Sequence, residues 1–166
     1  MERIRRDVFR TPWGWMGAVR SEEGLRGLVL PRQGREEVEM LLGRFGAAAP
    51  AGPWDELRRQ VTEYLAGRRR SFRISLDVPP ATAFAEEVRR VVASIPYGKT
   101  MTYGEVAASA GKPAAARAVG RIMNRNPVPL IIPCHRVLAA AGPGGFASGL
   151  ETKMRLLVLE GRGRVP

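Results

Sequence analysis

The sequence TYGEVAASAGKPAAARAVGRIMNRN, residues 102–126, predicts two short helices joined by a turn. Thr102 and Glu105 have the spacing of a capping box, in which the side chain of each residue bonds to the backbone of the other at the start of a helix. This helix is expected to run through Ala110, because the Gly-Lys-Pro that follows interrupts helical structure. A second helix is expected over residues 114–124.

The second helix is apolar on one face and basic on the other. Its basic face carries Arg117 and Arg121, and Arg125 follows just past its end. Two short helices joined by a glycine-containing turn, with a basic second helix, are typical of a helix-turn-helix that lies in a groove of DNA. Many such helix pairs serve only to build a core, so this segment alone leaves both interpretations open. The residues expected to face the core are Ala115, Ala118, Val119, Ile122 and Met123.

The segment NPVPLIIPCHRV, residues 126–137, contains the only cysteine and the only histidine of the chain, next to each other. The apolar run 128–132, bracketed by prolines, predicts a buried extended segment that delivers Cys134 to a pocket. A thiol attacks as the thiolate, so it needs a base, and His135 can take its proton directly or through a water molecule. Neighbours on an extended strand point to opposite faces, which favours the water. The alternative is that both residues are buried and structural.

The rest of the chain predicts an α+β protein with a boundary at Pro79-Pro80. The part before the boundary reads as a small α+β unit, and the part after it reads as mostly helical, with a further helix over residues 83–94. The elements expected before the boundary are strands over 8–10, 14–20, 25–30 and 72–76, helices over 35–45 and 54–66, and a loop over 47–53.

The charge of the chain favours a polyanionic partner. Of its 166 residues, 27 are Lys or Arg and 16 are Asp or Glu, which gives a formal net charge of +11. Such an excess attracts phosphates irrespective of base sequence. A composition rich in arginine for reasons of solubility is the alternative interpretation.

Several classes of protein are disfavoured by composition. One cysteine cannot form an internal disulfide, and with a single histidine it cannot build a Cys-rich zinc site, so no metal is expected. No apolar run is long enough to span a bilayer, so no membrane partner is expected. The start of the chain, MERIRRDVFRTPW, is basic but has no apolar stretch typical of a signal peptide. We therefore expect a cytoplasmic protein.

These motifs resemble the O6-alkylguanine-DNA alkyltransferases, also called methylated-DNA–protein-cysteine methyltransferases. The resemblance is dense over residues 83–161 and looser in the N-terminal third. It rests on Pro-Cys-His-Arg preceded by Asn-Pro-Val-Pro, and on four longer stretches: IPYGKTMTYGEVA (95–107), AARAVGRIMNRNPVPLIIPCHRV (115–137), GGFASGLETKMRLLVLEG (144–161) and, more loosely, GAVRSEEGLRGLVLP (17–31).

The resemblance implies a fold and an activity. It implies a structural N-terminal subdomain, residues 1–79, with an antiparallel, ribonuclease H-like sheet, and a mostly helical DNA-binding alkyltransferase domain, residues 80–166. The activity is irreversible transfer of an alkyl group from O6-alkylguanine, and from O4-alkylthymine, in double-stranded DNA to Cys134. Each molecule is used once, acts as a monomer and needs no cofactor.

Roles in the chemistry follow from the same resemblance. His135 matches the relay base and Glu160 the acid that orients it. Asn126 matches the asparagine that organises the active-site turn, and Tyr103 matches the tyrosine whose hydroxyl approaches the guanine. Cys134 attacks the alkyl carbon in line.

The resemblance also implies how DNA is bound. Arg117 matches the arginine that enters from the minor groove and fills the space left by a flipped base. The further residues implied to contact DNA are Thr102, Ala116, Ala118, Arg121, Arg125 and Arg136. The substrate pocket is implied to consist of Tyr103, Val137, Phe146, Ala147 and Ser148. The family usually has tyrosine at position 146 and glycine at position 148, and these departures bear on the range of alkyl groups accepted.

Two other functions compete with this interpretation. One is a protein that binds DNA lesions on the same scaffold without reacting, which the presence of Cys134 disfavours. The other is a Cys-His hydrolase, which would turn over repeatedly instead of once.

Overall fold

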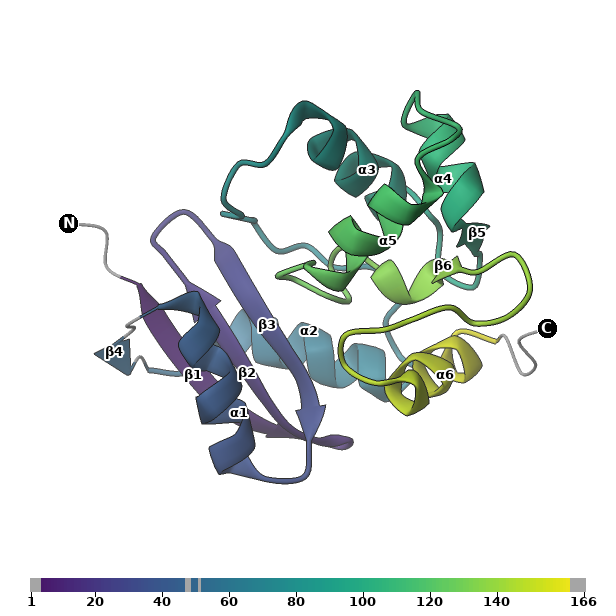
Figure 1. The fold of residues 1–166 in the computed structure, drawn as a ribbon. Coiled ribbons are helices and arrows are strands. Elements are labelled where there is room, and N and C mark those ends of the chain that lie inside the picture. Colours follow the sequence, from purple (N-terminus) through teal and green to yellow (C-terminus); the bar gives the residue numbers. More distant parts are fainter. Residues whose placement is uncertain (1–3, 47–48, 51, 162–166) are drawn as a thin grey trace. The chain divides into compact units, whose positions relative to one another are not determined.

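The computed structural model describes residues 4–46, 49–50 and 52–161, and the chain divides into two compact units between Pro79 and Pro80. Strands predominate in the first unit and helices in the second (Figure 1). The chain is therefore an α+β protein, as the sequence predicts.

The first unit is built on a four-stranded sheet with the order β3-β2-β1-β4. Strands β1 (Arg5–Thr11), β2 (Gly14–Arg20) and β3 (Leu25–Arg32) are antiparallel, as expected. The short strand β4 (Ala49–Pro50) adds a parallel pair to β1, so the sheet is mixed. Strand β4 lies within the segment 47–53, which is expected to be a loop. Residues 47, 48 and 51 of this segment are outside the described part of the chain.

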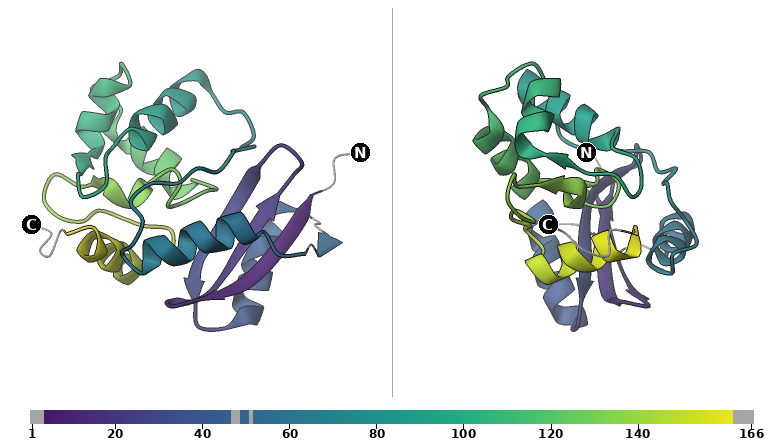
Figure 2. Two further views of the ribbon diagram at one scale, coloured as in Figure 1. Left: turned by 180° about the vertical axis from the view of Figure 1, so that it is seen from behind. Right: turned by 90° about the vertical axis from the view of Figure 1, so that its right-hand side faces the viewer.

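Helices α1 (Arg35–Leu42) and α2 (Asp55–Leu65) lie on opposite faces of this sheet (Figure 2), and a 3-10 turn, Gly43–Phe45, follows α1. Helix α1 buries Val38 and Leu42 in a cluster with apolar residues of β2 and β3. The helix sits close to the strand because residue 17 is glycine: a Cβ there would lie 2.6 Å from the Val38 side chain.

The strand expected over residues 72–76 does not form. Only Leu76 makes an isolated bridge, to Leu25. The backbone of Arg73 bonds instead to the buried amide of Gln60, whose Oε1 accepts from Arg73 N at 2.7 Å. A side chain therefore takes the place of a neighbouring strand, which a pattern of apolar residues cannot reveal.

Over its described residues, 80–161, the second unit contains four α-helices and a two-stranded parallel sheet. The helices are α3 (Ala83–Ala93), α4 (Tyr103–Ser109), α5 (Ala116–Asn124) and α6 (Leu150–Leu159), and the strands are β5 (Met101–Thr102) and β6 (Val137–Leu138). The capping box forms at the start of α4 as predicted: Thr102 Oγ1 accepts from Glu105 N, and the Glu105 carboxylate accepts from Thr102 N. Helices α4 and α5 pack against each other as a helix-turn-helix.

The segment 128–132 is buried, as expected, but it is a turn and not an extended strand. Leu130 has φ +73°, the only positive φ at a non-glycine residue in the described part of the chain. Asn126 fixes the turn, since its Nδ2 donates to Ile132 O at 2.7 Å and its Oδ1 accepts from Val128 N at 3.1 Å. The turn leads into a short 3-10 helix, Cys134–Arg136.

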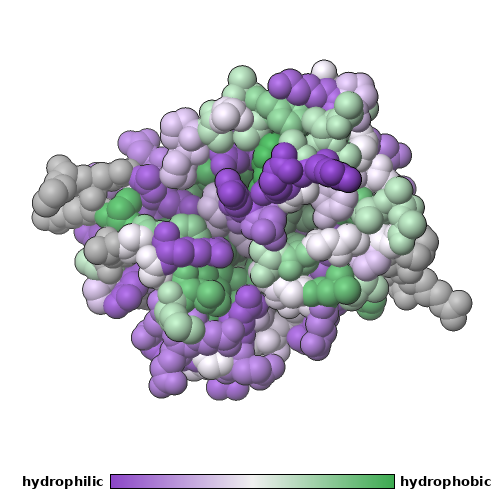
Figure 3. Space-filling view, viewed as in Figure 1, coloured by the Kyte–Doolittle hydropathy of each residue, from purple (hydrophilic) through white to green (hydrophobic). Residues whose placement is uncertain are grey.

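Hydrophilic side chains cover most of the face seen in Figure 3, with apolar side chains exposed in small separate areas. No helix in the described ranges has both the length and the apolar character needed to cross a membrane.

Candidate active site

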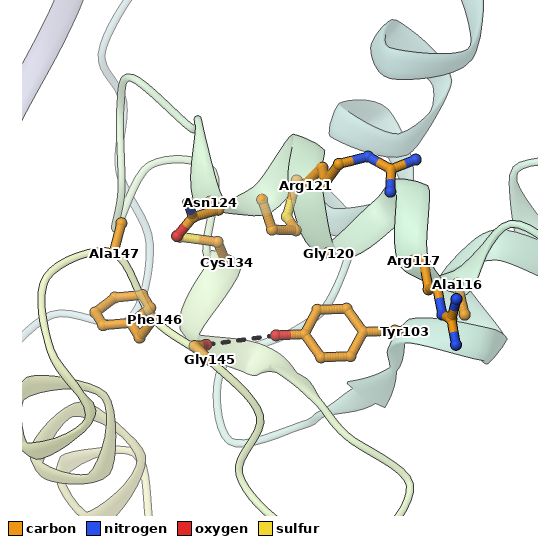
Figure 4. Close-up of a pocket in the computed structure, with 11 residues that line it drawn as sticks. Tyr103, Ala116, Arg117, Gly120, Arg121, Asn124, Cys134, Gly145, Phe146 and Ala147 are labelled. Atoms are coloured by element: carbon orange, nitrogen blue, oxygen red, sulfur yellow. Dashed lines mark hydrogen bonds between the residues drawn. The ribbon is translucent and has the colours of Figure 1, made fainter.

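A cavity of about 610 Å³ in the second unit opens onto Cys134 (Figure 4). It is bounded by the start of α4, one face of α5, the cysteine and the loop that precedes α6. The lining residues are Tyr103, Ala116, Arg117, Gly120, Arg121, Met123, Asn124, Cys134, Gly145, Phe146 and Ala147.

The thiol lies at the cavity wall in an apolar setting. Cys134 is 6% exposed, and burial raises the pKa of its thiol to about 11, although the Asn126 side chain and the charge of Lys153 act in the opposite direction. At neutral pH the group is therefore a thiol, and it must lose its proton to react. Asn126 thus both shapes the turn and approaches the sulfur.

His135 is completely buried, and its Nε2 lies 2.9 Å from Glu160 Oε1. Burial lowers the pKa of the imidazole, so the ring is neutral at pH 7. Because the partner of Nε2 is a carboxylate, we assign the proton of the neutral ring to Nε2, which leaves Nδ1 as the basic nitrogen. The pair thus has the chemistry of a general base held in one tautomer.

Arg136, for which the resemblance predicts a contact with DNA, is part of this buried network in the structure. It is 7% exposed; its Nε lies 2.9 Å from Glu160 Oε2 and its Nη1 donates to Ile95 O at 2.6 Å. The amide of Gly98 also donates to Glu160 Oε2, at 3.2 Å. In the structure this guanidinium balances the charge of the buried Glu160 carboxylate, which does not support a direct contact between Arg136 and a phosphate.

Lys153, on α6, is a buried residue of the site that the sequence does not predict. Its Nζ donates to Val137 O at 2.6 Å and to Gly145 O at 3.0 Å, so it links the strand after the cysteine to the loop that borders the cavity. Burial lowers the pKa of the ammonium to about 8, and its charge in turn favours the Cys134 thiolate. In the sequence it looks like an ordinary helical lysine.

The opposite wall is formed by Tyr103, whose hydroxyl donates to Gly145 O at 3.4 Å (Figure 4). Burial raises the pKa of this phenol, which therefore stays protonated and able to donate. The loop passes very close to the ring: a Cβ at Gly144 would lie 2.8 Å from Tyr103 Cε2. Glycine at 144, with φ +72°, is thus required both by conformation and by space.

The structure brings together seven of the residues predicted from the sequence. Tyr103, Ala116, Arg117, Arg121, Cys134, Phe146 and Ala147 all line the cavity. The other predicted pocket residues, Val137 and Ser148, are not among the lining side chains, although the Val137 carbonyl is held by Lys153. The φ of Ser148 is not positive, so a serine fits where the family usually has glycine.

The remaining predicted DNA contacts lie on the helix pair. Arg125 is exposed and Ala118 half-buried, while the Thr102 hydroxyl is engaged in the cap of α4. Gly120, Met123, Asn124 and Gly145 line the cavity without having been predicted. For Gly120 and Asn124 the sequence contains the signal, because residues 116, 120 and 124 share one helical face with Arg117 and Arg121. Met123 is expected in the core and is buried, although it also lines the cavity.

No group of three or more His, Cys, Asp or Glu side chains suited to a metal ion occurs among the described residues.

Comparisons with known proteins identify the family. A family model described as the DNA-binding domain of 6-O-methylguanine DNA methyltransferase matches residues 83–162. The methylated-DNA–protein-cysteine methyltransferase of Methanosarcina acetivorans is 41% identical over 155 residues, which cover 93% of this chain and 96% of the relative. That of Mycobacterium leprae is 43% identical over 118 residues, covering 70% and 71%.

Solved structures give the same result over nearly the whole chain. The O6-methylguanine methyltransferase of Mycobacterium tuberculosis matches with a TM-score of 0.79 at 33% identity, covering 100% of this chain and 96% of the other. The Mycobacterium tuberculosis OGT crystallised in complex with DNA matches with a TM-score of 0.80 at 30% identity, covering 95% and 93%. The chain belongs to the family of methylated-DNA–protein-cysteine methyltransferases.

Proposed function

We propose that this protein repairs DNA by transferring the alkyl group of O6-alkylguanine to Cys134. The observation that carries the proposal is a single cysteine at the wall of a cavity, followed in the chain by a buried histidine that is bonded to a buried glutamate. The cavity is bordered by a basic helix of a helix-turn-helix, which is where DNA is expected.

The reaction is an in-line displacement at the alkyl carbon. His135 Nδ1 takes the thiol proton, directly or through a water molecule, while Glu160 stabilises the imidazolium that forms. The bond from Cys134 Sγ to carbon forms as the bond from carbon to O6 breaks. The electron pair leaves with the guanine. The Tyr103 hydroxyl stabilises it by donating a hydrogen bond to the base in place of the long bond to Gly145 O, and the guanine then takes up a proton from water.

The base must leave the duplex for this geometry to be reached. The alkylated guanine is flipped from the minor-groove side, and Arg117 fills the space that it leaves. The backbone carbonyls of Cys134 and Val137 accept from the guanine amino group, and amides of the 146–149 loop donate to O6. O4-alkylthymine presents the same alkyl–oxygen group and is a second substrate.

The product is a thioether on the protein, which water does not hydrolyse. Each molecule therefore acts once, and as a monomer, since all of the proposed chemical groups come from one chain. The protein is expected to act in the cytoplasm, on double-stranded DNA.

Peptide mass spectrometry after incubation with a duplex containing one O6-methylguanine tests the proposal. The peptide with Cys134 should gain the mass of one methylene unit, and Cys134→Ser should gain nothing. DNA binding without any change at Cys134 would show that the protein binds lesions without repairing them.

A further inference from the structure

The face of α5 that borders the cavity carries two arginines one helical turn apart, Arg117 and Arg121. Both are exposed, and neither makes an ion pair or a hydrogen bond with any residue of the described ranges. Most other helical arginines of the chain do have a carboxylate partner. On α3, for example, Arg89 pairs with Glu86 at 3.1 Å and Arg90 pairs with Glu87.

The absence of carboxylates extends well beyond the helix. The sequence from 106 to 150 contains no Asp or Glu, yet it includes Lys112, Arg117, Arg121, Arg125 and Arg136. Among the arginines of this stretch, Arg136 is neutralised by Glu160, which comes from outside the stretch. The charge of Arg121 is therefore left for an external anion, and next to DNA that anion is a phosphate.

Arg121 lies at the rim of the cavity and not beside the sulfur. Its side chain extends from α5 away from Cys134, whereas Arg117 lies near Ala116 (Figure 4). Asn124, one turn further along the same face, also lines the cavity, and it has no hydrogen-bond partner among the described residues. A base that reaches Cys134 leaves its sugar and phosphate at this rim.

We infer that Arg121 binds the phosphate next to the flipped nucleotide, with Asn124 beside it, and that this contact is separate from the flipping role of Arg117. The inference rests on the proposed function. It assigns the two arginines to different parts of the substrate: Arg117 acts only where a base stack must be filled, and Arg121 acts wherever the substrate carries a backbone phosphate.

A series of substrates of increasing size, from the free base to a duplex, separates the roles of Arg117 and Arg121. The substrates are O6-benzylguanine as free base, its deoxynucleoside, the 3′,5′-bisphosphate of that nucleoside, a single-stranded trinucleotide and a duplex, and the readout is the rate of Cys134 alkylation by intact mass. Arg121→Ala should react normally with the base and the nucleoside, and roughly tenfold more slowly with every phosphate-bearing substrate. Arg117→Ala should be slow only with the duplex.

Two further variants complete the test. Arg121→Lys should recover part of the rate with the bisphosphate, because lysine restores the positive charge but cannot form the bidentate hydrogen bonds of a guanidinium with the phosphate. Arg90→Ala removes an exposed arginine elsewhere in the same unit and should leave every rate unchanged. With wild-type protein, the advantage of the bisphosphate over the nucleoside should shrink as salt is added, and Arg121→Ala should lack this dependence.

The inference is overturned if Arg121→Ala and Arg121→Lys slow the free base as much as the bisphosphate, or if the bisphosphate reacts no faster than the nucleoside with the wild type. Either result leaves the proposed function intact as long as wild-type Cys134 is alkylated. A wild-type protein that reacts with none of the five substrates refutes the proposed function itself.

Discussion

His135 and Glu160 form a buried pair in which Nε2 lies 2.9 Å from Oε1, and both side chains are closed to solvent. The carboxylate is bonded at the same time by Arg136 and by the amide of Gly98. The glutamate therefore cannot rotate away from the imidazole without breaking several buried hydrogen bonds. The network therefore fixes the tautomer of the His135 ring.

Glu160→Gln should slow alkyl transfer to Cys134 by about 10- to 100-fold, because the amide can donate to Nε2 and so favours the wrong tautomer. The variant also leaves the Arg136 guanidinium buried without a charge partner, which should lower the free energy of unfolding by about 3–5 kcal/mol. The rate with free O6-benzylguanine and denaturant unfolding measure the two effects.

The double variant Arg136→Met, Glu160→Gln separates stability from chemistry. It removes both buried charges, so the free energy of unfolding should largely recover while the rate stays low. A rate that recovers together with stability would mean that the glutamate has only a structural role.

Lys153→Met should slow the modification of Cys134 by iodoacetamide roughly tenfold at pH 7, because a positive charge beside the thiol favours the thiolate. The pKa of Lys153 is about 8, so the lysine itself becomes neutral as the pH rises through that value. The ratio of wild-type to variant rates should therefore fall towards one above pH 8. A ratio that stays constant with pH would show that Lys153 acts only by holding the loop. Since Cys134 is the sole cysteine, the reagent reports on it alone.

Gly144→Ala should slow the reaction with O6-benzylguanine strongly, because the new methyl group would lie 2.8 Å from the Tyr103 ring and push the loop out of place. Gly149→Ala is the matched control: its φ is +94° but a Cβ there meets nothing within 4 Å. Gly149→Ala also carries backbone strain, since φ +94° with ψ 145° is a conformation that glycine alone adopts easily, but it has no clash. Equal rates for the two variants would argue against a positional role for the Tyr103 contact.

Leu130→Gly should unfold at a higher denaturant concentration than Leu130→Ala, by about 1 kcal/mol in the free energy of unfolding, because only glycine adopts φ +73° without strain. The same comparison at Leu156, which is equally buried but helical, should give the reverse order by about 1 kcal/mol. If alanine is the more stable residue at both positions, residue 130 does not have a positive φ in solution.

The sequence predicts best the parts that local interactions decide. Helices α4 and α5 follow from a capping box, a Gly-Lys-Pro break and apolar spacing, all within a few residues of one another. The segment 72–76 is predicted to be a strand but forms only an isolated bridge at Leu76, and the segment 128–132 is predicted to be extended but is a turn. In both cases the backbone bonds to a side-chain amide, of Gln60 and of Asn126, and an apolar run does not record such a partner.

The residues of the site also differ in whether local sequence or distant contacts reveal them. Cys134 and His135 are conspicuous because each is the only residue of its kind. Lys153 and Arg136 are two basic residues whose roles depend on burial, and burial is decided by residues far away in the chain. The sequence alone makes the first look like a surface lysine and the second like a DNA contact, whereas the structure buries both among carbonyl and carboxylate oxygens.

The number of methyl groups removed per protein molecule tests the central claim most directly. A fixed amount of protein is mixed with increasing excess of a duplex containing O6-methylguanine, and repaired guanine is counted at the plateau alongside the intact mass of the protein. The account predicts a plateau at one repaired base per molecule, with every protein carrying one added methylene unit on Cys134. Product that continues to form beyond one per molecule, or a protein whose mass is unchanged, would contradict it.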